Sequence, residues 1–433
     1  MVVWRTGLSE PFTEDETDLM RQIASRGALA IDNARRYTRE HRAAMALHQS
    51  PLPPTTTDTP AAETAGIYRP ASGGAGTSGD WYDAIALPSL RLALVAGDVI
   101  GHGIPASVTM GRLRRRHPDT PRPRTECSGM CSPVSRTWSS ALRPKHRPTN
   151  TTTVDATCLY AVYAPVTRRC AMASAGHPPP VLIRPNGTAE AVDIVPGPPL
   201  AVSGMPYETT TIALEPGSVL ALYTDGLVDR GADDDTDGGL RRLTRALTTS
   251  HGSNRTLDET GRAIVADLVD EEARGDATLL LARTRAVPAE DTAHRQIPAD
   301  PAAVSEAGEW TTRQLTLRGS GRPAFTTELI VHELVTNAMR HGRPPAELRL
   351  IRQNVLVCEV TDASSTQPRL RRARATDEGG RGLFLVARLA ERWGCRHGQN
   401  YKRSGPSSSS LAPTGPSRTL GVRSSKRAAP GVG

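Results

Sequence analysis

Four aspartates beside glycines stand at the predicted ends of strands, where their carboxylates could hold a metal ion. They are Asp80, Asp98, Asp225 and Asp276. Carboxylate oxygens suit hard divalent cations, and no Cys/His set in the chain competes for a softer metal. Two such ions side by side can deprotonate a shared water that attacks phosphorus in line. One Asp–Gly pair is most often a plain turn, but four of them in this setting favour a metal site.

A second set of polar residues follows later in the chain. Glu333 and Asn337 are four residues apart and share one face of a predicted helix. Asp362 ends a predicted strand, and Gly380 and Gly382 precede a helix whose free N–H groups can hold phosphate. In such a pair the acid could orient a water molecule and the amide could hold a Mg²⁺–phosphate group. Taken singly, a polar pair at this spacing is usually a solvated helix face, and a lone glycine loop is weak support.

The apolar pattern predicts the elements that must position these side chains. Asp98 and Asp225 each close an apolar strand, and Asp276 opens one. In the first region, strands are predicted over 92–96, 156–162, 181–184, 218–224 and 277–283, with helices over 240–247 and 262–269. In the second region, helices are predicted over 301–315, 327–340 and 383–392, with strands over 346–351 and 355–360.

A long amphipathic helix is predicted near the start of the chain, up to about residue 47. Thr13 is its candidate cap, with Glu16 completing a capping box. The segments FTEDE at 12–16 and ALAIDNAR at 28–35 resemble the last helix of a GAF sensor domain. A connector or dimerisation helix is the plainer interpretation, and we expect that a homodimer could form through it. Prolines after this helix predict a linker over 51–66.

Composition and charge limit the classes of function. The 433 residues are enough for two or three domains. The net charge of +8 is uneven, because residues 111–150 carry +8, residues 396–433 carry +7, and the remainder carries −7. The basic segments are rich in Pro and Ser without hydrophobic periodicity, which predicts disorder rather than nucleic-acid binding. With no signal peptide, membrane span or disulfide pattern, we expect a cytoplasmic protein that does not bind a membrane.

Four motifs in the first region resemble one known family. The motifs are GDWYD at 79–83, GDVIGHG at 97–103, AGHPPP at 175–180 and YTDGL at 223–227. In this order they resemble the SpoIIE-type branch of the PPM metal-dependent serine/threonine phosphatases. The resemblance implies an αββα sandwich with a pair of Mn²⁺ or Mg²⁺ ions. It also implies that Asp80, Asp98 and Asp225 are catalytic metal ligands and that Val99 contributes a backbone carbonyl. We expect His177 to be a buried structural residue.

Two departures from that family stand out. Its last metal motif is Asp-Asp, but this chain reads Gly275-Asp276. Asp276 remains a candidate ligand, although we expect its side chain to point elsewhere because neighbours on an extended chain face oppositely. The segment 115–150 contains prolines and no apolar stripe where the family has helices. Either the segment is translated in a shifted reading frame, which we favour, or it is a disordered insertion.

The motifs of the second region resemble the N, G1 and G2 boxes of GHKL ATPases, especially the anti-sigma-factor serine kinases. The resemblance implies that Asn337 is a Mg²⁺ ligand, that Glu333 is the general base and that Asp362 recognises adenine. Gly380 and Gly382 would form the phosphate loop of an ATP site. Ser364 stands where many relatives have glycine. The expected last strand is not evident after residue 397, which leaves an edge unpaired.

The sequence therefore predicts an α+β multidomain protein. The predicted parts are a GAF remnant with connector helix (1–50), a linker (51–66), a PPM-type αββα sandwich (67–285), a GHKL α/β sandwich (297–397) and a disordered tail (398–433). The predicted function is removal of phosphate from Ser/Thr of a phosphorylated anti-anti-sigma (STAS-type) regulator, with a sigma factor as a second candidate partner. The alternatives are a non-catalytic partner-switch protein with a degenerate phosphatase site, or a frame-damaged remnant.

Overall fold

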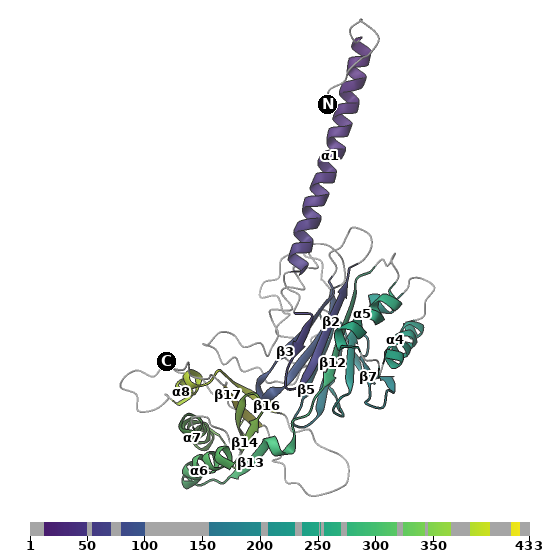
Figure 1. Ribbon diagram of the computed structural model, residues 1–433. Coiled ribbons are helices and arrows are strands. Elements are labelled where there is room, and N and C mark those ends of the chain that lie inside the picture. Colours follow the sequence, from purple (N-terminus) through teal and green to yellow (C-terminus); the bar gives the residue numbers. More distant parts are fainter. Residues whose placement is uncertain are drawn as a thin grey trace, which may run out of the picture.

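The computed structural model (Figure 1) describes residues 13–49, 54–70, 79–99, 156–200, 207–229, 236–250, 252, 255–269, 275–317, 324–342, 345–364, 382–398 and 417–424. The atypical segment 115–150 and the glycine at position 380 lie outside these ranges. No helix within the described ranges is long and apolar enough to cross a membrane.

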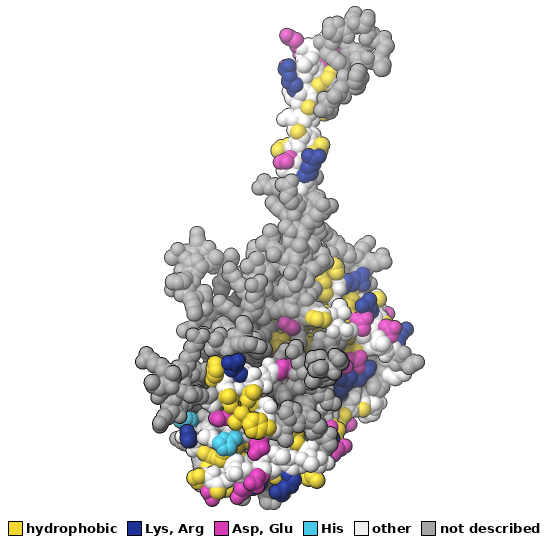
Figure 2. All heavy atoms as spheres, turned by 60° about the vertical axis from the view of Figure 1, so that its left-hand side comes forward, with side chains coloured by type: hydrophobic (Ala, Val, Ile, Leu, Met, Phe, Trp, Pro, Cys, Tyr) yellow, Lys and Arg dark blue, Asp and Glu magenta, His cyan; other side chains and the backbone are white. Residues whose placement is uncertain are grey.

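Helix α1 (Glu14–Gln49) begins with the predicted capping box. The N–H of Glu16 donates to Thr13 Oγ1 at 3.3 Å, and the N–H of Thr13 donates to the Glu16 carboxylate at 2.9 Å. Figure 1 shows α1 standing away from the sheets, and Figure 2 shows hydrophobic side chains on its surface. Leu19, Ile23 and Leu29 are each more than half exposed. A homodimer through this helix and its origin in a GAF domain remain predictions.

Two antiparallel sheets form the first module. One sheet has the order β1 (Thr56–Asp58), β2 (Ala62–Arg69), β12 (Ala277–Thr284), β11 (Val219–Tyr223), β7 (Val181–Ile183) and β8 (Ala189–Ala191). The other has the order β10 (Thr210–Ala213), β6 (Arg169–Ala175), β5 (Ala156–Ala164), β4 (Leu92–Val99) and β3 (Trp81–Ala86), with β9 (Pro196–Gly197) paired in parallel to β6.

The two sheets pack face to face around one apolar core. Leu94 and Leu159 of the second sheet belong to the same buried cluster as Leu222 and Leu280 of the first. The alternate residues of β4, such as Val95, are buried in a separate cluster on its other face. Because β4 is covered on both faces, its sequence is a continuous apolar run rather than an alternating one.

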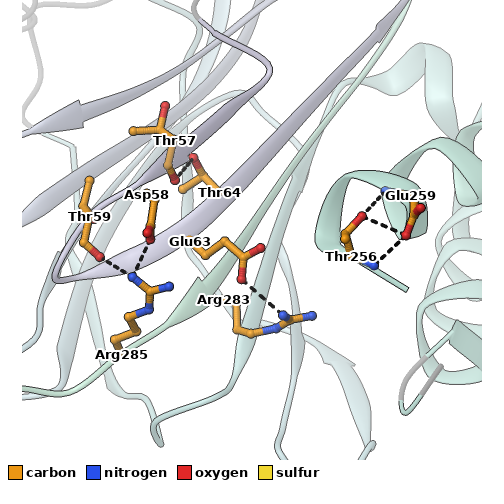
Figure 3. A network of polar contacts seen from close by, with 9 residues as sticks. All are labelled: Thr57, Asp58, Thr59, Glu63, Thr64, Thr256, Glu259, Arg283 and Arg285. Carbon is orange, nitrogen blue, oxygen red and sulfur yellow. Dashed lines mark hydrogen bonds and ion pairs between the residues drawn. The ribbon is translucent and has the colours of Figure 1, made fainter. Parts of the chain in front are cut away.

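Helices α4 (Thr236–Ser250) and α5 (Leu257–Leu268) cover the outer face of the first sheet. Thr256 and Glu259 form a capping box at the start of α5, which Figure 3 shows beside ion pairs of the sheet. Helix α5 approaches β2 closely, because a Cβ on Gly261 would lie 2.2 Å from Ile67 Cδ1. The module is therefore a mixed α+β sandwich, as the sequence predicts.

The predicted boundary of this module is wrong at its start. Strand β1 and the first half of β2 lie within 51–66, which the sequence analysis assigns to a linker. Small residues obscure the strand pattern there, yet Ala62 and Ala65 are almost fully buried on opposite faces of the sheet. In Figure 3, Glu63 of β2 pairs with Arg283 of β12 at 3.2 Å, which joins the two strands at this edge.

The second module is a five-stranded sheet with helices on one face. The strand order is β13 (Thr292–Ile297), β14 (Ala346–Arg352), β15 (Leu356–Asp362), β17 (Ser417–Ser424) and β16 (Arg392–Gly398). Its helices are α6 (Ala302–Leu317), α7 (Ala324–His341) and α8 (Gly382–Leu389). Leu334 of α7 and Val386 of α8 share a buried cluster with Leu348 and Val360 of the sheet.

The predicted disorder over 398–433 is wrong for the stretch that forms β17. This strand lies between β15 and β16 and pairs with both in antiparallel register, so the expected unpaired edge is filled. The sequence around Leu420 and Val422 alternates apolar residues with Gly and Arg, which is the period of a strand. The Ser- and Pro-rich composition of its surroundings concealed that period.

Candidate functional site

Asp80 and Asp98 come together at one end of the second sheet. Asp80 precedes β3, and Asp98 lies near the end of β4, where Trp81 and Gly97 are register partners. Side chains alternate along a strand, so both acids continue the row that faces the opposite sheet, marked by Tyr82 and Leu94. Their carboxyl groups lie close enough for each to affect the pKa of the other.

The two backbone segments that carry this pair approach each other unusually closely. The N–H of Val99 donates to the Gly79 carbonyl at 3.3 Å. A Cβ on Gly79 would lie 2.4 Å from Val99 O, and a Cβ on Gly97 would lie 2.4 Å from the Trp81 ring. Because any larger residue would clash with these atoms, the two glycines are what allow the strands to bring the acids into contact.

Burial makes the charged forms of this pair unfavourable. Burial raises the pKa of Asp80 well above its ordinary value, and the nearby charge of Asp98 raises it further. The pKa of Asp98 is also raised, by burial first and then by the charges of Asp225 and Asp276. Two adjacent carboxylates can both ionise only if a cation compensates them, so this donor set suits a divalent metal that replaces the shared proton.

The other two aspartates approach from the first sheet. Asp225 follows β11 in the short helix η2 (Asp225–Leu227), is exposed, and accepts the N–H of Gly226 at 2.9 Å. Asp276 precedes β12 and is buried. The turns that hold them touch, because a Cβ on Gly226 would lie 1.9 Å from the Asp276 carbonyl oxygen.

The expectation that the Asp276 side chain points away from the site is wrong. Alternation along β12 places Asp276 in the same inward row as Leu280, and the hydroxyl of Tyr68 on β2 donates to its carboxylate. Its charge also acts on Asp98. Gly275 is instead exposed and contributes no ligand. Among the described residues, no three acidic, His or Cys side chains are grouped closely enough to form a ready metal centre.

Thr224 is a site residue that the sequence analysis missed. Its hydroxyl donates to the Asp80 carboxylate at 2.6 Å and accepts the N–H of Thr278 at 2.9 Å. Thr224 is completely buried and belongs to the first sheet, whereas Asp80 belongs to the second. The only sequence signal for this role is its place directly before Asp225.

His177 joins the same two sheets, as its predicted structural role requires. Its Nε2 lies 3.0 Å from the Tyr223 carbonyl oxygen, and its Nδ1 lies 3.0 Å from Thr157 Oγ1. An Nε2–H that donates to the carbonyl leaves Nδ1 to accept from the threonine hydroxyl. Burial lowers the pKa of His177 to about 4, so the ring is neutral at pH 7. A neutral, fully bonded histidine supports the position of Tyr223 and the strand end beyond it.

The second candidate site gathers around α7. Glu333 lies against the start of α8, because a Cβ on Gly382 would lie 2.1 Å from Glu333 Oε2. Asn337 lies one turn further along α7. Asp362 is buried at the end of β15, where its carboxylate accepts the N–H of Ser364 at 2.8 Å. The four described members of the predicted nucleotide site are thus carried by two packed helices and the strand beneath them.

The role of Thr224 can be tested by removing its hydroxyl. We expect Thr224→Val to weaken Mn²⁺ binding roughly 10- to 100-fold, as observed for groups that orient metal ligands. It should also lower the melting temperature, because the buried N–H of Thr278 loses its acceptor. Thr224→Ser retains the hydroxyl and should bind Mn²⁺ nearly as the unaltered chain does. Isothermal titration calorimetry measures the affinities, and equal binding by the Val and Ser variants would contradict the assignment.

Comparison with known families agrees with the two-module structure. Residues 88–285 match the family model of stage II sporulation protein E (SpoIIE), and residues 297–403 match that of the histidine kinase-like ATPase domain. The resemblances to SpoIIE-type phosphatases and to GHKL ATPases are therefore confirmed, while the closer likeness to anti-sigma-factor serine kinases stays a prediction.

Individual relatives are distant. Protein IcfG of Synechocystis sp. is 28% identical over 233 residues, which cover 49% of this chain and 36% of that protein. The RsbU and RsbW domains of Rv1364c from Mycobacterium tuberculosis are 21% identical, with a TM-score of 0.45, over 86% of this chain and 95% of that one. The SiaA-PP2C domain of Pseudomonas aeruginosa is 19% identical, with a TM-score of 0.40, over 60% of this chain and 98% of that one. On the family matches, this chain carries a SpoIIE-type PPM phosphatase domain followed by a histidine kinase-like ATPase domain.

Proposed function

We propose that the first module is a divalent-metal-dependent protein serine/threonine phosphatase. The observation that carries this proposal is the close approach of the buried Asp80 and the half-buried Asp98, which a cation would complete. Asp225 would act as a third ligand from the opposite sheet, with the Val99 carbonyl beside the pair. Mn²⁺ or Mg²⁺ at such a site supplies Lewis-acid activation of water and neutralises phosphate charge.

The protein's own residues have separate tasks in this proposal. Thr224 holds the Asp80 carboxylate through its 2.6 Å hydrogen bond, and Tyr68 holds that of Asp276. Without cations, the four acids would repel a phosphate dianion, so binding of the phosphorylated substrate depends on the metal. Asp276 faces the site and is a candidate fourth acid.

We propose a phosphorylated STAS-type anti-anti-sigma regulator as substrate, with the second module as an ATP-binding, anti-sigma-kinase-like partner domain. A phosphatase and a histidine kinase-like ATPase on one chain can act in opposite directions on one serine or threonine. In the second module, Asn337 would hold Mg²⁺, Glu333 would act as base and Asp362 would read adenine, while Gly382 and Gly380 would hold phosphate. A sigma factor is the second candidate partner.

Gly275 favours one alternative, a non-catalytic partner-switch protein with a degenerate phosphatase site. The family's carboxylate is missing at this position, and metal affinity depends on the number of charged ligands. Metal-dependent turnover distinguishes the two functions.

The first test is manganese-dependent release of phosphate from a phosphoserine STAS protein. Asp98→Asn and Asp225→Asn should each lower the rate roughly 100-fold or more, since the metal contributes several kcal/mol to the transition state. Asp193→Asn is the matched control, because Asp193 is an exposed aspartate of the same module. Activity that survives both ligand substitutions would defeat the metal mechanism.

A second test restores the missing carboxylate. Among the described residues, a Cβ at position 275 meets only Gly226 Cα at 3.9 Å, and the backbone is outside the left-handed region, so they leave space for a side chain. We expect Gly275→Asp to raise Mn²⁺ affinity about tenfold through added ligand charge. Gly275→Asn, which has the same shape without the charge, should leave the affinity near its original value. If both variants behave alike in calorimetry, position 275 does not act on the metal.

The ATP site can be tested independently of the phosphatase. Asn337→Ala should reduce binding of Mg²⁺–ATP at least tenfold, because it removes the oxygen expected to coordinate the ion. His332→Ala is a control on the same helix, since His332 is exposed. A fluorescent ATP analogue gives the affinities, and unchanged binding by Asn337→Ala would exclude the assigned nucleotide site.

A further inference from the structure

A small apolar cluster joins the two modules. Leu90 of the phosphatase module lies in it, at the tip of the hairpin formed by β3 and β4. Val287 comes from the connecting segment, and Ile351, Val355 and Val357 come from the ATPase module. All five side chains are buried, with at most 8% of their surface exposed.

The hairpin tip covers the face of the ATPase sheet that its helices leave open. Leu356, Cys358 and Val360 of β15 belong to the helix-covered core, so the intervening Val357 faces the other way. In Figure 1 the ATPase strands accordingly lie beside the lower end of the phosphatase sheets. The contact is close, because a Cβ on Gly394 of β16 would lie 3.0 Å from Pro88 Cγ.

The tip has a strained backbone. In η1 (Pro88–Leu90), Ser89 has φ 68° and Leu90 has φ 56°. This left-handed region is unfavourable for residues with a Cβ, and a bulky residue such as leucine is rarely found there. Such a conformation persists where surrounding contacts hold it. The contacts that bury Leu90 come largely from the ATPase module.

The other end of the same hairpin carries the acidic pair. From the tip, β3 runs back to Asp80 and β4 runs forward to Asp98, with continuous antiparallel pairing from Ala86↔Leu92 to Trp81↔Gly97. A contact that fixes the twist and register of this hairpin at its tip therefore also affects the distance between the Asp80 and Asp98 carboxylates.

We propose that the ATPase module clamps the β3–β4 hairpin, so that divalent-metal affinity at Asp80 and Asp98 depends on docking of the two modules. This inference rests on the proposed metal site. Because coupling is reciprocal, metal binding in turn strengthens the docking of the ATPase sheet.

The experiment compares three variants of the full chain. Val357→Asp breaks the contact from the ATPase side. Leu90→Asn breaks it from the hairpin side while keeping a residue that tolerates the left-handed conformation, so hairpin folding is spared. Val195→Asp is the matched control, since Val195 is a half-exposed valine of the phosphatase module. ATP binding by Val357→Asp checks that its module remains folded.

Two measurements are made on each chain. Calorimetry with Mn²⁺ alone should show an affinity at least tenfold weaker in Val357→Asp and Leu90→Asn, and unchanged in Val195→Asp. Hydrogen exchange should be faster at residues 84–94 in the first two variants. Mn²⁺ should slow exchange at residues 351–357 in the unaltered chain and not in the two undocked variants.

The outcomes separate this inference from the function on which it rests. Absence of Mn²⁺ binding in the unaltered chain would overturn the proposed phosphatase site and the clamp with it. Mn²⁺ binding that is equally strong in the unaltered chain and in Leu90→Asn would overturn the clamp alone. A rate of hydrogen exchange at residues 351–357 that does not change when Mn²⁺ is added would likewise contradict the coupling.

Discussion

The contact between the Asp80 and Asp98 carboxylates is the constraint on which the phosphatase site depends. A buried carboxylate beside a half-buried one is unfavourable unless a proton or cation lies between them. The surrounding structure nevertheless enforces the contact, through the Gly79–Val99 backbone hydrogen bond, the Trp81 ring over Gly97 and the Thr224 hydroxyl. The proposed cation would relieve the repulsion between the two carboxylates that these interactions otherwise maintain. In the proposed metal site, the stability of this end of the sandwich and the affinity for a cation would therefore depend on the same contacts.

Core packing and site geometry are also linked, because the acids come from both sheets. Asp98 lies in the same inward row as Leu94 of β4, and Asp276 lies in the same inward row as Leu280 of β12. Leu94 and Leu280 both belong to the apolar core. The thickness of that core sets how far the acids of one sheet stand from those of the other. Thr224 and His177 add polar links between the sheets at the end where the apolar core stops. A substitution deep in the core would thus alter binding at the proposed metal site without touching a ligand.

Many of the candidate site residues could be predicted from the sequence, because short-range patterns mark them. Asp98 and Asp225 stand at the ends of apolar runs, and Glu333 and Asn337 share a helix face, so spacing alone identifies them as candidates. The Thr224–Asp80 and Tyr68–Asp276 contacts join residues 144 and 208 positions apart, and no local pattern marks such partners. Strands β1 and β17 were missed for another reason. Their neighbours are rich in Thr, Pro, Ser or small residues, and composition conceals the alternation that pairing requires.

Gly275 stands where the resemblance to the PPM phosphatases predicts an acidic ligand. Its φ lies outside the left-handed region, and the described residues leave space for a Cβ, so they would accommodate an aspartate there. The Asp276 side chain occupies a different place, because alternation fixes it in the inward row, where the Tyr68 hydroxyl donates to it. From that row its charge still acts on Asp98. In the proposed metal site, the negative charge therefore comes from Asp80, Asp98 and Asp276 on the inward rows and from the exposed Asp225 beside them, with none from position 275.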